Sequence, residues 1–341
     1  MKLLNCCHLL VLLLVFARPA LAQGNDDAPS LIKQAVQFNK DGKYAKAADK
    51  FTQALKLEPA NVYANYGIAY SLMQMGKAND GIPYLEKVIK ANSSLTAGAY
   101  DLLGSIYDKG HESEKAIAAF NEGIKIDPAY QRLHYNLGLV YFRDKKYAEA
   151  EKCATDAIKL DPKHANSHRM YALVCFHQNK RAAALLGFCS FILLEPQTAR
   201  SSEAYGNIQH ILQGGTLKPA PGETAPLASD ANTLALNQAI SQAAAEAAKG
   251  KYATPADQLT AQLSVIFKAV GALAEKQAGN DFFREYFAAW FYKLALSPNM
   301  PAFARLISSA ANKDDYSKWL AEHSREADDL NNWIAATPRS F

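Results

Sequence analysis

The segment that decides the fold is Tyr135–Pro162, which reads YNLGLVYFRDKKYAEAEKCATDAIKLDP. It holds no glycine-rich phosphate loop, no paired carboxylates and a single cysteine, so it lacks the groups that catalysis usually needs. Its last three residues recur with small changes, as LEP at 57–59, IDP at 126–128 and LEP at 194–196. Because Pro128, Pro162 and Pro196 are spaced 34 residues apart, the segment is one unit of a structural repeat.

This period and the residues that recur within it resemble the tetratricopeptide repeat family. The family pattern has Leu-Gly at positions 7 and 8, an aromatic at 11, Ala at 20, an aromatic at 24, a small residue at 27 and Pro at 32. The opening segment fills six of these positions with Leu137, Gly138, Tyr141, Ala150, Ala157 and Pro162. The preceding unit fills seven with Leu103, Gly104, Tyr107, Ala116, Phe120, Gly123 and Pro128.

Five units are predicted when the candidates are aligned on their ends. Their bounds are about 28–61, 62–95, 97–130, 131–164 and 165–198, and a helix at 202–212 is predicted to cap the array, which then spans 28–212. Positions 8 and 20 are Ala or Gly in every unit, because two helices approach closely only where side chains are small. Those ten residues are Ala35, Ala69, Gly104, Gly138, Ala172, Ala47, Gly81, Ala116, Ala150 and Ala184.

Two units depart from the pattern. The second has Ser93 where proline is expected and Val88 at the small position 27, and the fifth has Phe191 at that position. We expect Phe191 to widen the helix spacing or to close the array, with the helix that follows covering its last open face.

The chain changes character after the array. Residues 213–230, QGGTLKPAPGETAPLASD, are rich in Gly and Pro and are predicted to be a linker. Residues 231–341 are predicted to form a second helical region, in which the aromatic spacing of 281–296, DFFREYFAAWFYKLAL, indicates a core-facing helix face. The predicted fold class is all-α: a right-handed superhelical tetratricopeptide solenoid of about five helix-turn-helix units, followed by a separate C-terminal helical domain.

Residues 1–22 are predicted to be a signal peptide. Lys2 supplies a positive start, Leu9–Ala17 is wholly apolar, and Ala20-Leu21-Ala22 fits a cleavage site before Gln23. Nine apolar residues fall well short of the roughly 20 that cross a bilayer, although a retained leader stays open as the alternative. We therefore expect export to the periplasm or the extracellular space, free or attached to the envelope. The C-terminal stretch that begins at Phe282 also resembles the tail of some exported bacterial tetratricopeptide proteins, particularly of Bacteroidetes.

Composition excludes some function classes. The formal net charge is +4 without clustered basic blocks, which gives no support to nucleic-acid binding. No cofactor or metal site is predicted, since His164 and His168 fall in repeat positions that favour packing. The cysteines that follow the leader, Cys153, Cys175 and Cys189, are expected to pack as small apolar residues, and a disulfide among them stays open.

The family resemblance implies a function in recognition, in which a partner protein or peptide docks on a groove lined by first-helix residues. Carried onto this chain, the groove positions are Tyr63, Tyr66, Tyr70, Asp101, Ser105, Asp108, Arg132, Tyr135, Phe142, Arg143, Arg169, Phe176 and His177. Relatives that clamp the C-terminal carboxylate of chaperones need Lys and Asn where this chain has Ile32 and Val36, so a cytosolic chaperone partner is not expected.

The sequence therefore predicts an exported, non-enzymatic scaffold or adaptor with an unidentified protein or peptide partner and no membrane span after cleavage. Two alternatives stay open. One is a binding protein of the cell envelope for carbohydrates or small ligands, and the other is an enzyme whose site in the C-terminal helices carries no recognised motif.

Overall fold

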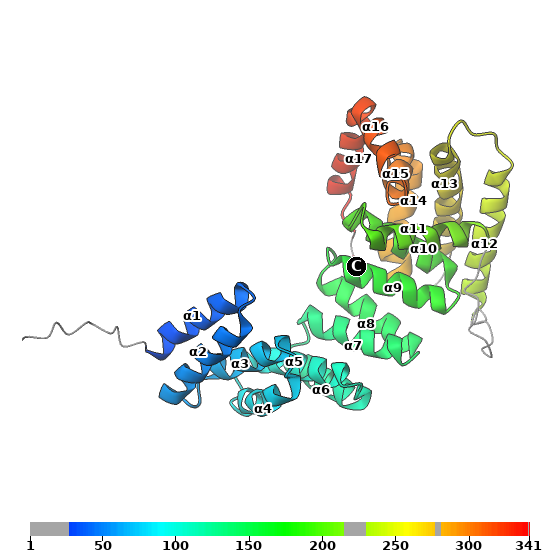
Figure 1. Ribbon diagram of the computed structural model, residues 1–341. Coiled ribbons are helices and arrows are strands. Elements are labelled where there is room, and N and C mark those ends of the chain that lie inside the picture. The colour runs from blue at the N-terminus through cyan, green and yellow to red at the C-terminus, as the bar shows by residue number, and fades with distance from the viewer. Residues whose placement is uncertain (1–26, 215–229, 277–280, 340) are drawn as a thin grey trace, which may run out of the picture. The chain divides into compact units, whose positions relative to one another are not determined.

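A computed structural model of the chain describes residues 27–214, 230–276, 281–339 and 341 (Figure 1). The predicted signal peptide and most of the predicted linker lie outside these residues. The chain divides into two compact units, Met1–Ala91 and Asn92–Phe341, and each is described by itself.

The first unit holds two helix pairs. Its elements are α1 (Ala28–Lys40), α2 (Tyr44–Leu57), α3 (Val62–Gln74), the 3₁₀ helix η1 (Ala78–Gly81) and α4 (Ile82–Lys90). Phe51 of α2 is 1% exposed and lies over Gly67 of α3, where a Cβ atom would come within 2.2 Å of the ring. The missing side chain at Gly67 is therefore what lets the two helices share this core.

The second unit begins with three helix pairs and a further helix. These are α5 (Thr96–Lys109), α6 (Ser113–Ile126), α7 (Gln131–Arg143), α8 (Tyr147–Leu160), α9 (Ala165–His177), α10 (Arg181–Leu194) and α11 (Ala199–Leu212). The C-terminal helices are α12 (Ala231–Ala248), α13 (Pro255–Ala274), the π-helix η2 (Phe283–Ala288), α14 (Ala289–Leu296), α15 (Met300–Ser308), α16 (Lys313–Glu322) and α17 (Ser324–Ala336). The part of the chain that the structure describes contains no strand, and the all-α fold class is confirmed.

Small residues lie at the helix crossings, as the repeat pattern requires. All ten residues at positions 8 and 20 are buried. A Cβ atom on Gly81 would lie 3.2 Å from Cα of Ala69, so these two positions meet backbone to backbone within one repeat. The close helix approach that Ala and Gly at positions 8 and 20 predict is therefore the contact that forms the helix pair.

The turn inside each helix pair has a left-handed residue at position 15. Glycine supplies it in the first two repeats, where Gly42 and Gly76 have φ of 71° and 76°. His111, Lys145 and Asn179 adopt φ between 54° and 58° at the same position of the next three repeats. Glycine is thus favoured but not required, because the left-handed region costs other residues only about 1–2 kcal/mol.

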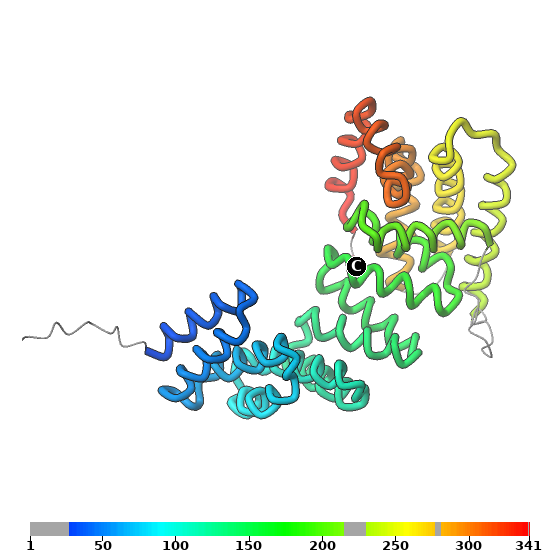
Figure 2. The backbone as a smooth tube through the Cα atoms, in the orientation of Figure 1, coloured from blue at the N-terminus to red at the C-terminus, as the bar shows by residue number. Residues whose placement is uncertain are grey.

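Helix α10 lies at the centre of the second unit. All twelve residues from Arg181 to Ile192 are buried, because α9 and α11 cover it together with α12, η2 and α15. Figures 1 and 2 show the C-terminal helices standing beside α10 and α11. The helices after the predicted linker thus share one hydrophobic core with the last repeats, from Ala150 to Leu330.

Polar contacts reinforce this shared core. The backbone N–H of Arg181 donates to Oδ1 of Asn237 at 3.0 Å, and its Nη2 donates to the backbone oxygen of Asn237 and to Oγ of Ser241. Asn237 in turn donates from Nδ2 to the backbone oxygen of Asn179 at 2.7 Å. The start of α10 is therefore attached to α12 as well as to its own repeat.

The aromatic face of η2 and α14 is a core face, as its spacing predicts. Phe287, Trp290 and Leu294 are at most 4% exposed. The C-terminal segment lies against this face, since Nε1 of Trp290 donates to the backbone oxygen of Thr337 at 2.7 Å. The Arg339 guanidinium lies 4.2 Å from the Trp290 ring centroid and donates from Nη1 to Oγ of Ser190 on α10 at 2.6 Å.

Replacing Gly138 with leucine should lower the melting temperature. A Cβ atom there would lie 2.8 Å from Cε of Met170 and 3.1 Å from Cβ of Cys153, so the added side chain overpacks the core between α7, α8 and α9. We expect a loss of about 1–3 kcal/mol, which corresponds to about 3–10 °C by circular dichroism. Gly206→Leu is the matched control, because no atom lies within 4 Å of a Cβ at Gly206. Equal melting temperatures for the two variants would contradict the repeat register.

Arg339→Met should destabilise the second unit, because it removes the contact with Trp290 and the hydrogen bond to Ser190 on α10. Together these interactions are worth about 1–3 kcal/mol. Arg325 is exposed on α17, so Arg325→Met serves as the control. Calorimetry should show a lower unfolding temperature for Arg339→Met alone, and a drop of the same size in the control would show that Arg339 has no special role.

Candidate functional site

The predicted groove residues lie on the first helices of the repeats, α3, α5, α7 and α9. In the second unit, α5 contacts α7 and α7 contacts α9, so their side chains form one continuous surface. We call this surface the first-helix face and extend it to α11, which continues the same 34-residue spacing.

Ion pairs between repeats hold the charged side chains of this face. Arg132 Nη2 lies 2.5 Å from Oδ2 of Asp101, and Asn136 donates to the other oxygen of that carboxylate at 2.8 Å. Arg143 forms a two-point pair with Asp108, in which Nη2 donates to Oδ2 at 3.1 Å. Each pair joins α5 to α7, one repeat apart, so the side chains are fixed before any partner arrives.

The next two helices are joined in the same way. Arg169 of α9 donates from Nη2 to Oε2 of Glu203 on α11 at 2.8 Å. Arg200 of α11 donates from Nη1 to Oδ1 of Asn166 on α9 at 2.7 Å. Arg169 is therefore matched by an acidic residue of the next first helix, whereas Arg200 meets a neutral amide there and forms its ion pair with Glu195, at the C-terminal end of α10.

Aromatic rings complete the face between α7 and α9. The Tyr135 ring lies edge-on to His164, with centroids 5.0 Å apart. Phe142 packs edge-on to His177 at 5.1 Å, and His177 also stacks on Tyr147 at 5.0 Å. All five rings are partly buried, so each keeps some surface accessible to solvent.

Two ionisable groups on this face have pKa values that are shifted by burial. Burial raises the pKa of the Asp101 carboxyl, although the Arg132 guanidinium opposes the change. Burial also raises the pKa of the Tyr135 hydroxyl, against the nearby charges of Arg169 and Arg200. Tyr135 therefore stays a neutral hydrogen-bond donor and acceptor at neutral pH.

The remaining predicted residues have simpler surroundings. Ser105 donates its hydroxyl to the backbone oxygen of Asp101 at 2.8 Å and is held within α5. In the first unit, Tyr63 is 58% exposed, Tyr66 is partly buried, and Tyr70 meets Tyr44 edge-on with ring centroids 6.5 Å apart.

Two predicted groove residues do not face solvent. Phe176 is 3% exposed, because it turns inward against Phe188 and His210. Asp101 is 2% exposed and acts by orienting Arg132 and Asn136. The prediction that these two side chains line an exposed groove is therefore corrected, and their contribution is structural.

Several residues of the face were missed in the sequence. They are Asn136, Tyr147, Asn166, Arg200 and Glu203. A signal was present for Glu203, since it lies 34 residues after the predicted groove residue Arg169 and carries the opposite charge. The family pattern predicts groove positions only within the five repeats, and α11 lies after the fifth, so the sequence predicts α11 as a capping helix without groove residues.

The histidines and cysteines have structural roles. His134 and His168 hold the backbone oxygens of Pro128 and Pro162 at 2.9 and 3.0 Å through Nε2, so each links its helix to the preceding turn. Cys153, Cys175 and Cys189 are buried and free, and burial raises the pKa of the Cys153 thiol to about 12. Across the described ranges, no group of three or more His, Cys, Asp or Glu residues could hold a metal ion.

Three protein-family models match the repeat region of this chain. A family model described as TPR repeat matches residues 104–145, and two models described as Tetratricopeptide repeat match residues 131–164 and 39–105. None of the three matches extends beyond residue 164.

Curated proteins also resemble part of this chain in sequence. Tetratricopeptide repeat protein 6 of Homo sapiens is 27% identical over 123 residues, 35% of this chain and 23% of that protein. Hsp70-Hsp90 organizing protein 3 of Arabidopsis thaliana is 33% identical over 94 residues, 28% of this chain and 17% of that protein. The chain thus spans less than a quarter of the length of either relative.

The solved structure of Pseudomonas aeruginosa pilF is 19% identical, has a TM-score of 0.50, and covers 55% of this chain and 84% of its own. This likeness shows the fold alone. The family matches between residues 39 and 164, together with the buried small residues at positions 8 and 20, show that this part of the chain is built of tetratricopeptide repeats.

Proposed function

We propose that the chain is an adaptor that binds a peptide segment of a partner protein on the first-helix face. The observation that carries the proposal is the set of partly exposed Arg side chains that inter-repeat ion pairs hold in place, with the partly exposed ring of Tyr135 on the same face. Tyr and Arg dominate the binding energy of protein interfaces, and side chains that are already ordered lose less entropy on binding.

The charge pattern indicates what the partner segment should carry. Arg132, Arg143 and Arg169 have side chains that are 51%, 45% and 27% exposed, and each already faces an acidic residue. Exposed ion pairs contribute only about 0–1 kcal/mol, so a partner carboxylate can replace Asp108 or Glu203 at little cost. Arg132 keeps its own partner, because Asp101 is buried and would be left unpaired. A peptide with acidic residues and an aromatic or aliphatic anchor suits this face.

The partner in this proposal is not a chaperone of the cytosol. The relatives named as Hsp70-Hsp90 organizing proteins share the repeat, but Ile32 and Val36 stand where such relatives need Lys and Asn. The leader at residues 1–22 supports export, and we propose a periplasmic or extracellular adaptor of the exported bacterial type. No helix within the described ranges is long and apolar enough to cross a membrane.

The peptide-binding proposal is tested with peptides selected from a random displayed library against the full chain. In fluorescence anisotropy, Tyr135→Ala and Arg169→Ala should each weaken the selected peptides about tenfold, as expected for interface hot spots. Lys152→Ala is the matched control, because Lys152 lies on the second helix α8 and also takes part in one ion pair, with Asp156. Equal losses in all three variants, or a library that yields no binder, would refute the assignment of this face.

The export proposal predicts a defined mature end. When the full-length gene is expressed in a bacterium with a secretion pathway, the protein should be recovered outside the cytosol with Gln23 as its first residue. Terminal sequencing checks this, and Lys2→Glu should slow processing because it removes the positive start of the leader. Recovery of the uncut chain from the cytosol would rule out export.

A further inference from the structure

The C-terminal helices enclose a pocket of about 670 Å³ that is separate from the first-helix face. It opens between the start of α13, the start of α15, and the two last helices α16 and α17. The residues that line it are Asp257, Thr260, Pro298, Asn299, Pro301, Ala302, Arg305, Trp319, His323, Glu326, Asp329 and Trp333. Its volume suits a small organic molecule or a single long side chain.

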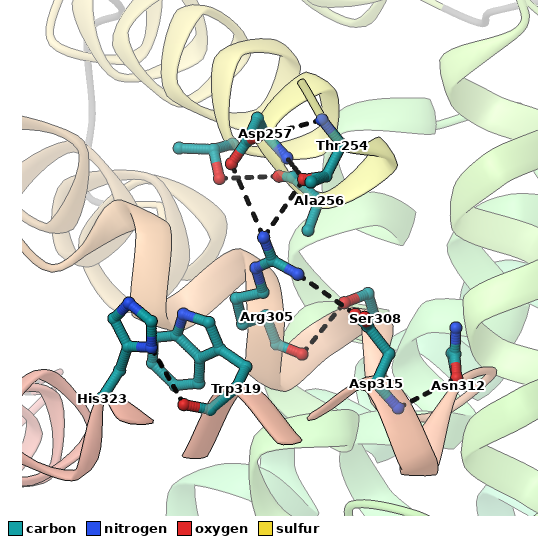
Figure 3. Close-up of polar contacts among 10 residues, drawn as sticks. Thr254, Ala256, Asp257, Arg305, Ser308, Asn312, Asp315, Trp319 and His323 are labelled. Carbon is teal, nitrogen blue, oxygen red and sulfur yellow. Dashed lines mark hydrogen bonds and ion pairs between the residues drawn. The ribbon is translucent and has the colours of Figure 1, made fainter. Parts of the chain in front are cut away.

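Aromatic rings form one wall of the pocket. Trp319 stacks on His323 with ring centroids 5.1 Å apart and planes inclined by 6° (Figure 3). Trp319 also stacks on Tyr316, with ring centroids 6.0 Å apart. Trp333 packs edge-on against Trp290 at 5.1 Å and is held by the core. These rings are fixed by their neighbours, so the wall exists before a ligand binds.

The guanidinium of Arg305 is already committed within the protein. Its Nη1 lies 3.1 Å from Oδ2 of Asp315, and its Nη2 donates to Oγ1 of Thr254 at 3.1 Å and lies 3.7 Å from Oδ1 of Asp257. Figure 3 shows it turned toward Asp257 and Thr254, with Trp319 beside it. Arg305 therefore fixes the shape of the pocket floor and leaves little positive charge for the remaining acidic groups.

Two carboxylates of the pocket have no partner. Glu326 and Asp329 lie on α17, three residues apart on one helix face, and neither makes a hydrogen bond or ion pair with any described residue. The lining residues include three carboxylates, those of Asp257, Glu326 and Asp329, and one guanidinium, that of Arg305. With His323 neutral, the lining therefore carries two more negative than positive charges. That excess favours a cationic ligand.

A buried amide points to the same pocket. Asn299 is 7% exposed, and its side-chain amide makes no hydrogen bond within the described part of the chain. Its amide atoms are not among the enclosed polar atoms that lack a partner, so they reach the space of the pocket, where a polar ligand group can pair with them. The neighbouring Thr260 donates to the backbone oxygen of Ala256 at 2.8 Å and keeps its acceptor sites free.

From this arrangement we propose that the pocket binds an organic ammonium ion, with the alkyl stem along Trp319 and Trp333 and the charged group at Glu326 and Asp329. A metal ion does not fit these residues, since no three acidic or histidine side chains converge in the described structure. Aromatic walls with carboxylates at the rim suit instead a cation that has an apolar stem. The shared chemistry is a primary alkylammonium group, whether of a free diamine or of a lysine side chain.

The test is a titration of the full chain followed by tryptophan fluorescence, because two of its three tryptophans line the pocket. The probes are 1,5-diaminopentane for the free amine and Nα-acetyl-lysine methylamide for the side chain. The uncharged comparison is the same lysine derivative acetylated at Nζ, and maltotriose tests a sugar instead. Both amines should change the fluorescence with saturation, and their affinity should fall as NaCl rises from about 20 to about 200 mM because salt screens the carboxylates.

Two variants and a control identify the charged groups. Glu326→Gln and Asp329→Asn should each weaken amine binding about tenfold while the circular dichroism spectrum and melting temperature change little, since neither carboxylate has a partner in the fold. Asp328→Asn removes the same charge from an exposed position on α17 that does not line the pocket, and should leave binding unchanged.

The outcomes separate the possible ligands. Tighter binding of the diamine assigns the pocket to small free amines, and tighter binding of the lysine derivative assigns it to a basic peptide side chain. The proposal is overturned if the acetylated derivative or maltotriose binds as tightly as the amines, if no amine binds at millimolar concentration, or if Asp328→Asn weakens binding as much as the two pocket variants.

Discussion

The second unit depends on the burial of α10, a helix without a polar face. Its sequence RAAALLGFCSFILL can be stable in water only if neighbours cover it on every side. The repeat itself supplies α9 and α11, and the C-terminal region supplies α12, η2 and α15. The last repeat is therefore stable only when the C-terminal helices cover α10, which explains why one hydrophobic core extends from Ala150 to Leu330.

This constraint also separates two kinds of surface. The first helices α5, α7 and α9 keep one face open, and there the charged residues are paired across repeats, as Asp108 and Arg143 are. The C-terminal helices α12, η2 and α15 pack against α10, and α13, α15, α16 and α17 leave open the pocket beside Trp319 and Trp333. The two proposed binding sites therefore lie on different elements, one on the first helices of the repeats and the other among the C-terminal helices.

The repeat was predictable because its signals are local. The 34-residue spacing and the small residues at positions 8 and 20 follow from two helices that touch within one unit, and Gly81 against Ala69 shows that contact directly. The turns carry a weaker signal, since His111 takes the left-handed conformation although a glycine, Gly110, directly precedes it. The aromatic core face of η2 and α14 was also predictable from the sequence, because Phe287, Trp290 and Leu294 recur with the helical period and are all buried.

What the sequence determined by itself is the period, the helix pairs and the face of each helix that packs inward, since these depend on residues a few positions apart. Only the tertiary structure decided that Asp101 and Phe176 are buried, that Arg132 and Arg143 pair with the preceding repeat, and that the C-terminal helices attach to α10. It also brought Asp257 and Trp333, more than seventy residues apart in the chain, to the lining of one pocket. Such contacts depend on how completed helices pack against each other, and a pattern read along one helix does not contain that information.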